Sequence, residues 1–422
     1  MSAVQTQQTA KGKYRPEIDG LRAFAVVAVI INHFNKDILP GGYLGVDIFF
    51  VISGYVITSS LHGRPSKDFK DFISGFYERR IKRLVPALSV FVLLTSMLAH
   101  LFIQNAGRYY ITGALSLFGI SNFYILSEAG GYWGLNASMN PFTQTWSLGV
   151  EEQFYILFPF LIYFSGFGRQ TKNGSRNLFL TVGVLTITSL VSFVSLYPIN
   201  QSAAYFLMPP RFWEMAVGCL IFIGFTKRAS IEAALEKVPP LLVIFLIILV
   251  MYLPQELAAI STITVVLLTS ILLASLKKGS GIFSVFTNSK VVYIGLISYS
   301  LYLWHWGFLA LARRTIGINK ATVAPLLALI LLSSVLSYEL IEKKTRRLSW
   351  SPKRAFTIIK GIVASGLVAF FCILLGTGLR AKFYLGANKS PNPPQNISQS
   401  STFHLFGDSH ANDIYNLLVN NG

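Results

Sequence analysis

An arginine and a histidine near the start of the chain have the spacing of two groups on one face of a helix. Arg22 and His33 lie in the apolar run LRAFAVVAVIINH, eleven positions apart. At about 100° per residue this is about three turns plus 20°, so both side chains share a face, roughly 16 Å apart. An ionisable group facing lipid costs roughly 2.5 kcal/mol or more, so that face must line protein or water. The alternative is that Arg22 snorkels as a flanking anchor and His33 lies at the far interface.

Three acidic residues are expected at the same membrane level as His33. Asp47 lies in GGYLGVDIFFVISGY, near the start of a second apolar run, and Glu151 and Glu152 lie in WSLGVEEQFY, at the start of a later one. A carboxylate bonded to one imidazole nitrogen fixes the tautomer and leaves the other nitrogen to act as a general base. The alternatives are a helix N-terminal charge for Asp47 and a solvated interfacial pair for the two glutamates.

A basic segment, FYERRIKRLVP, follows the second apolar run. Guanidinium groups bind phosphate bidentately, so Arg79, Arg80 and Arg83, together with Arg22, predict a phosphate-binding mouth on the cytoplasmic side. The alternative is that these cations only anchor the loop on the cytoplasmic side of the membrane.

Other polar residues in the apolar runs have structural interpretations. His305, in ISYSLYLWHWGF, is expected to be a satisfied structural histidine, with a pore-lining role as the alternative. Arg211 and Glu214 are one helical turn apart and could pair with each other. The sequence shows no cluster with metal-ligand spacing and no nucleotide-binding loop, so we expect no metal.

The elements that carry these residues are membrane helices. The chain of 422 residues is 53% hydrophobic and 13% charged. Apolar runs of about 17 to 22 residues, the length that spans hydrocarbon, recur from end to end. The net charge of +18 comes from cations between these runs, which indicates membrane orientation and not nucleic-acid binding. The fold class is therefore an all-α polytopic membrane protein in a lipid bilayer. The expected spans are 21–36, 43–61, 84–103, 146–167, 178–197, 211–226, 239–254, 257–276, 291–312, 322–341 and 357–378.

A further apolar run at 109–127 is interrupted by Gly113, Gly119 and Asn122. If it does not cross, the cytoplasmic loops hold about three times as many basic residues as the outer ones, as the positive-inside rule requires. We therefore expect a re-entrant or interfacial helix here. The result is eleven spans, with the N-terminus cytoplasmic and the C-terminus outside.

Six segments in this order resemble the membrane acyltransferase-3 family over residues 14–345: Arg22-x10-His33, GVDIFFVISGY, ERRIKRLVP, WSLGVEEQFY, RFWE and SYSLYLWHW. The resemblance implies transfer of an acyl group, commonly acetyl from acetyl-coenzyme A, to an extracytoplasmic carbohydrate or other acceptor. Carried over by position, it assigns the family's arginine and histidine to Arg22 and His33, its glutamate to Glu151, and its basic segment to Arg79, Arg80 and Arg83.

The C-terminal part is expected to start a second domain. Residues 1–378 form the membrane domain, 379–402 form a Pro-, Asn- and Ser-rich extracytoplasmic linker, and 403–422 give a strand, a Gly-Asp-Ser-His turn and a helix start. This segment is similar to the first block of the SGNH hydrolase-like α/β domains, which implies a truncated domain with Ser409 as its nucleophile. Because the activating partners have no counterpart in the sequence, we expect Ser409 to be inert.

The leading hypothesis is a membrane-bound O-acyltransferase of the bacterial inner membrane. Acetyl-coenzyme A would be its co-substrate, and a glycan such as lipopolysaccharide O-antigen its acceptor. His33, tuned by Glu151 or Asp47, would act as a general base or carry the acyl group. The alternative is a transporter or flippase without acyl transfer, although the Arg-x10-His pattern does not recur as an inverted repeat would require. The sequence leaves the oligomeric state open.

Overall fold

The computed structural model describes residues 14–62, 64, 66–103, 106–128, 135–227 and 237–377, and this part of the chain is helical without any strand. The longer helices are α1 (Pro16–Phe34), α2 (Gly45–Leu61), α3 (Phe69–Phe102), α7 (Thr145–Phe164), α8 (Gly174–Leu196), α10 (Met208–Lys227), α13 (Ala258–Ser275), α16 (Ser298–Arg314), α17 (Lys320–Leu336) and α19 (Arg354–Thr377). The shorter elements are η1 (Gly42–Leu44), α4 (Gly107–Ser116), α5 (Ser121–Ser127), α6 (Leu135–Met139), α9 (Gln201–Phe206), α12 (Pro240–Val250), η3 (Gln255–Leu257), α14 (Gly281–Phe286), α15 (Ser289–Leu296), the π-helix η4 (Ser337–Glu342) and α18 (Lys343–Arg347).

Each expected span coincides with helix, and the chain is a multi-pass helical membrane protein. Seven of the described helices are long and apolar enough to cross a membrane, and an eighth span results if α15 and α16, bent by 64°, count as one. Of the remaining expected spans, α1 and α7 have 19 and 20 residues, whereas α12 has only 11. The number eleven therefore stays a prediction. The linker 379–402, the segment 403–422 and Ser409 lie outside the described residues.

The interrupted run at 109–127 forms two short helices, α4 and α5. Ten residues of α4 extend about 15 Å, half of a bilayer core of about 30 Å, so α4 alone does not cross. The chain breaks at Gly119, whose φ of 67° favours glycine. A Cβ there would also lie 2.4 Å from Oε2 of Glu152. The short length and the break are those expected of a re-entrant segment.

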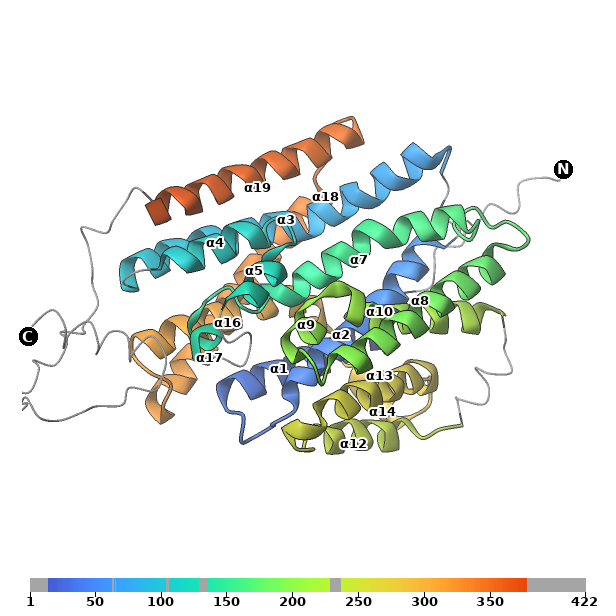
Figure 1. Cartoon of the computed structure of the whole chain (residues 1–422), viewed down its shortest axis with the longest axis horizontal. Helices are drawn as coiled ribbons and strands as arrows, with labels where there is room; N and C mark the ends of the chain where they lie inside the picture. The colour runs from blue at the N-terminus through green and yellow to red at the C-terminus, as the bar shows by residue number, and fades with distance from the viewer. Residues whose placement is uncertain are drawn as a thin grey trace, which may run out of the picture.

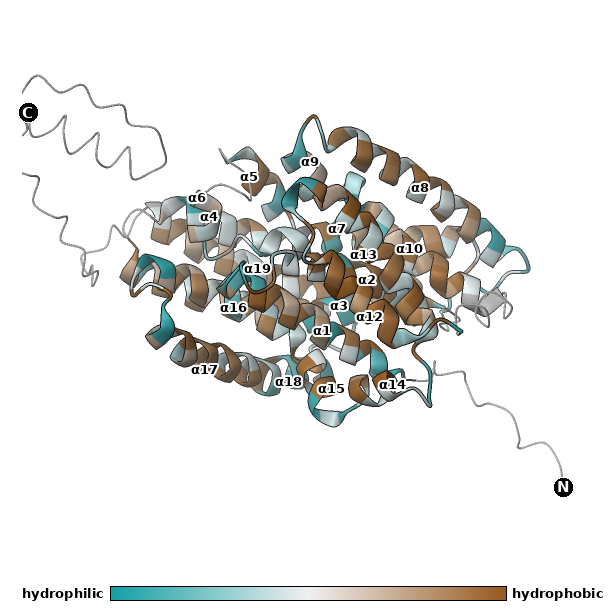
Figure 2. Cartoon of the chain, turned by 90° about the horizontal axis from the view of Figure 1, so that it is seen from below, coloured by the Kyte–Doolittle hydropathy of each residue, from teal (hydrophilic) through white to brown (hydrophobic). Residues whose placement is uncertain are grey.

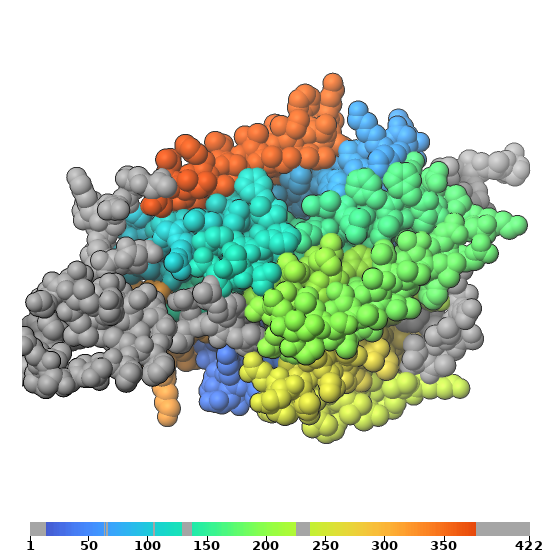
Figure 3. Space-filling view, in the orientation of Figure 1, coloured from blue at the N-terminus to red at the C-terminus, as the bar shows by residue number. Residues whose placement is uncertain are grey.

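The helices form a bundle with two distinct edges. Figure 1 shows α19 along one edge beside α3 and α4, with α12 and α13 at the opposite edge. The space-filling view places the same segments at the two margins (Figure 3). The peripheral helices α8 and α17 are predominantly hydrophobic (Figure 2), and they expose large side chains such as Ile187 and Leu332. These apolar surfaces fit contact with lipid.

Two glycines allow α2 and α10 to pack backbone against backbone. A Cβ at Gly54 would lie 1.8 Å from the carbonyl oxygen of Met215, and a Cβ at Gly218 would lie 2.1 Å from that of Val51. Small residues permit such close approach between membrane helices. The contact holds Asp47 on α2 close to the start of α10.

We predict that Gly54→Ala destabilises the protein, because a Cβ that meets a backbone carbonyl forces the two helices apart. Such overpacking costs about 1 to 3 kcal/mol. The control is Gly183→Ala in α8, where nothing lies within 4 Å of the added Cβ and the better helix propensity of alanine favours folding. Thermal unfolding in detergent measures both variants. Equal melting temperatures for the two would contradict the proposed close contact.

Candidate functional site

A cavity of about 600 Å³ opens between α1, α2, α3, α7 and α16. Its size lies within the usual range for small-molecule sites. Among the described residues, six arginines and two carboxylates, Asp19 and Glu151, line it. The arginines are Arg15, Arg22, Arg64, Arg80, Arg83 and Arg346. The excess of guanidinium groups makes the cavity suited to a ligand that carries several negative charges.

Glu151 is held on the wall of this cavity. Its Oε1 accepts hydrogen bonds from Ser53 Oγ and from the Tyr155 hydroxyl. The Arg80 guanidinium stacks over the ring of Tyr155, 4.1 Å from its centroid. Arg22 pairs with Asp19 at 3.2 Å, one turn earlier on α1. Glu151 therefore belongs to a network that positions cations.

This placement corrects two expectations about the carboxylates and the basic segment. Glu151 was expected beside His33, but it lies about 9 Å into α7, where it faces the cationic cavity. Of the three arginines in ERRIKR, Arg80 and Arg83 line the cavity, whereas Arg79 is exposed and does not. Successive residues on a helix point about 100° apart, so Arg79 and Arg80 cannot both face the same space.

Asp47 is also not beside His33. It pairs with Arg211 at 2.9 Å, and Arg211 pairs with Glu214 at 2.9 Å, which confirms the expected one-turn pair. All three residues are at most 1% exposed. The Arg211 guanidinium lies 5.2 to 5.9 Å from the ring centroids of its aromatic neighbours Phe50, Trp146 and Tyr205. Asp47 thus serves the contact between α2 and α10, because a buried guanidinium requires a charged partner.

The partner that the structure gives to His33 is His305. Nδ1 of His33 lies 2.9 Å from Nε2 of His305, and the two rings are nearly parallel, at 4°. Trp306 packs edge-on against His33, with centroids 4.5 Å apart, and Arg313 donates to the His33 carbonyl at 2.6 Å. His305 was expected to be a satisfied structural histidine, with a pore-lining role as the alternative. The pairing with His33 was not predicted, because 272 positions separate the two residues.

The backbone of α16 determines which nitrogens of the pair carry protons. Nδ1 of His305 lies 2.9 Å from the carbonyl oxygen of Leu301, so this nitrogen is the donor. Nε2 of neutral His305 is then an acceptor, and His33 donates to it through Nδ1. The lone pair of His33 therefore resides on Nε2, the arrangement of a general base or nucleophile.

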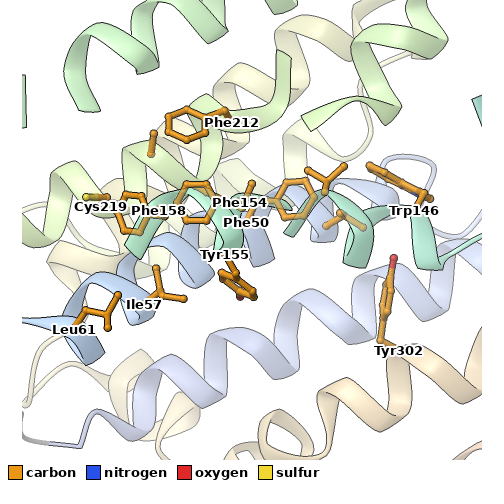
Figure 4. Packing of buried hydrophobic residues seen from close by; sticks show 14 of the residues in the cluster. Phe50, Ile57, Leu61, Trp146, Phe154, Tyr155, Phe158, Phe212, Cys219 and Tyr302 are labelled. Atoms are coloured by element: carbon orange, nitrogen blue, oxygen red, sulfur yellow. The ribbon is translucent and has the colours of Figure 1, made fainter. Parts of the chain in front are cut away.

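Tyr302 connects the cavity with the histidine pair. Its ring lines the cavity and lies 5.6 Å from that of His305. Its hydroxyl is 2.7 Å from Ser147 Oγ and donates to the Gln144 carbonyl at 3.1 Å. In Figure 4, Tyr155 and Tyr302 lie on the same side of the row formed by Phe50, Phe154 and Phe158. Both tyrosines line the cavity, and Tyr302 also lies next to His305.

Two cavity residues beyond the end of α2 were not predicted. His62 Nδ1 and one terminal nitrogen of Arg64 are buried and have no hydrogen-bond partner among the described residues. Burial lowers the pKa of His62, and burial followed by repulsion from Arg354 lowers the pKa of Arg64. In the sequence, only the position of these two residues near the basic segment could have marked them as site residues. Within the described ranges, no group of three His, Cys, Asp or Glu side chains could hold a metal ion.

Comparison with known proteins identifies a family and relatives that agree with each other. Residues 15–341 match the family described as an acyltransferase domain. The chain is 32% identical over 393 residues to "Putative O-acetyltransferase SAS0844" of Staphylococcus aureus strain MSSA476, which covers 87% of this chain and 64% of that protein. It is 30% identical over 352 residues to "O-acetyltransferase OatA" of S. aureus strain NCTC 8325, covering 79% and 58% of the two chains. The chain thus spans less than two thirds of these relatives. No solved structure matches.

We predict that Arg211→Met strongly destabilises the protein, since it leaves two carboxylates buried without their cation. Removing one partner of a buried pair typically costs about 3 to 5 kcal/mol. The control is Arg108→Met: this arginine pairs with Glu128 at 3.1 Å and is 72% exposed at the side chain, so the expected cost is about 0 to 1 kcal/mol. Thermal melting of both variants tests this, and similar losses would contradict the assigned role of Arg211.

Proposed function

Because the chain belongs to the acyltransferase-3 family, we propose that it transfers an acyl group, most simply acetyl, from a coenzyme A thioester to a hydroxyl of an extracytoplasmic glycan. The supporting observation is the arginine-lined cavity that ends at Tyr302, beside the His33–His305 pair. Acyl transfer requires an acyl donor held close to a nucleophile or its general base, and the cavity and the histidine pair are the candidates for these two parts.

Coenzyme A fits the cavity by its charge. Its phosphates would contact Arg22, Arg80 and Arg83, and its thioester would extend along Tyr302 toward the histidines. His33 Nε2 would then act in one of two ways. As a general base it takes the proton of the acceptor hydroxyl, which attacks the thioester carbon and releases the thiol. As an acyl carrier, Nε2 attacks that carbon first, the C–S bond breaks, and the hydroxyl then takes the acyl group from the imidazole.

The topology fits a donor on the cytoplasmic side and an acceptor on the other. We place the N-terminus in the cytoplasm because the basic loops then lie inside, and we assign the protein to the inner membrane of a bacterium. The acceptor is an extracytoplasmic carbohydrate, with lipopolysaccharide O-antigen as the first candidate to test. The relatives' names support transfer to oxygen.

We predict that His33→Ala lowers acetyl transfer by at least about 100-fold, since Nε2 supplies the base or the nucleophile. The assay follows radiolabelled acetyl-coenzyme A with the purified protein in sealed liposomes, with and without a glycan acceptor. The control is His100→Ala, which removes a histidine that contacts Tyr110 outside the cavity lining and should retain activity. Full activity of a folded His33→Ala protein would refute the mechanism, and glycan flux without donor consumption would favour a transporter.

We predict that Arg80→Gln raises the KM for acetyl-coenzyme A by about tenfold or more, because a charged hydrogen bond to phosphate is lost. Arg79→Gln is the matched control, since the neighbouring arginine is exposed outside the cavity and its KM should change by less than about twofold. Steady-state kinetics measures both. Equal effects of the two substitutions would mean that the donor binds outside the cavity.

A further inference from the structure

Helix α16 begins inside the bundle, at the wall of the cavity. The break between α15 and α16 bends the chain by 64°, and α16 starts there at Ser298 without a side-chain cap. The first N–H groups of a helix have no partner within it, and they carry a partial positive charge. An uncapped helix start in a protein interior requires another acceptor.

Ser298 provides a second, independent observation at the same place. The residue lines the cavity, is 1% exposed, and its Oγ has no hydrogen-bond partner among the described residues. A buried hydroxyl without a hydrogen-bond partner is unfavourable, which indicates that a ligand supplies the partner here. The hydroxyl can donate a hydrogen bond, as can the neighbouring N–H groups, so a single anionic acceptor would satisfy all of them.

Arginines complete the site. Gly295 packs against α1, where a Cβ would lie 1.8 Å from the Asp19 carbonyl oxygen. Ser298 lies three residues after Gly295, and Arg22 lies three residues after Asp19. Both Ser298 and Arg22 line the cavity. The Tyr299 hydroxyl donates to the Leu84 carbonyl at 3.1 Å, which holds the first turn of α16 against the segment after Arg83. Helix N–H groups, a hydroxyl and guanidinium groups together form a typical phosphate site.

We propose that the N-terminus of α16, with Ser298 Oγ and Arg22, binds a phosphate group of the acyl donor. This inference rests on the proposed function and assigns the donor's class: a thioester on a carrier that bears phosphate. The half-helix start provides the fixed anion contact, and the arginines neutralise the remaining charge. A donor without phosphate loses these contacts and binds only through the chain that carries its thioester.

The test compares Ser298→Asp with Ser298→Asn in the full chain. The two side chains have nearly the same shape and differ by one negative charge, which would occupy the phosphate position in Ser298→Asp. The Asp variant should bind coenzyme A at least about tenfold more weakly in calorimetry, and its KM for acetyl-coenzyme A should rise equally. The Asn variant keeps a hydrogen-bond donor and adds no charge, so its loss of affinity should be the smaller of the two. The melting temperatures of both variants are measured beside wild type, so that a loss of affinity in a folded Asp variant is distinguished from a loss of fold.

Acetyl-pantetheine, which carries the same thioester without phosphate, is the second donor. Its KM should be the same in all three proteins. Equal coenzyme A affinity in Ser298→Asp and Ser298→Asn would overturn the inference, as would a parallel loss for both donors, which would indicate a distorted cavity. If wild-type protein binds no coenzyme A, the proposed donor itself is wrong, and the phosphate site is refuted with it.

Discussion

Burial of charge in an apolar helical bundle governs how this molecule is assembled. Arg211, fully buried, lies between Asp47 of α2 and Glu214 of its own helix, and its guanidinium faces the rings of Phe50 and Trp146. Taking such charges out of water costs several kcal/mol per ion, and only close partners offset it. This one cation therefore determines which faces of α2, α7 and α10 meet. The close contact at Gly54 brings the charges within reach.

The charges that line the cavity are compensated differently from that of Arg211. Among the six arginines of the cavity, Arg15, Arg22 and Arg346 pair with Glu17, Asp19 and Glu342. Arg64, Arg80 and Arg83 line the same space without an ion-pair partner among the described residues. Glu151 is held by Ser53 and Tyr155. The three arginines without a carboxylate partner give this space a positive charge that suits an anionic ligand.

Much of the architecture was predictable, because apolar length and the distribution of cations report membrane spans directly. The depth of individual residues along the spans was less accessible, and the direction of each side chain around its helix was not. Asp47 was expected at the membrane level of His33 as one of two candidate partners of its imidazole. It pairs with Arg211 instead, since the first apolar runs do not reveal which later helix packs on which face. His305 shows the same difficulty. Its aromatic surroundings suggested a structural histidine, and only the folded bundle brings it to His33.

Helix α16 touches every part of the site in sequence order. Its first residue lies at the cavity wall, its eighth bonds to the ring of His33, and its sixteenth bonds to the His33 carbonyl, while α1 runs alongside in the same direction. Seven residues of straight helix separate Ser298 from His305, about 10 Å. Helix α16 alone therefore fixes the distance between the cavity wall and the histidines. Under the proposed function, this fixed distance would select a donor by length: a carrier whose arm is too short or too long would not bring its thioester to His33, whatever its affinity for the cavity.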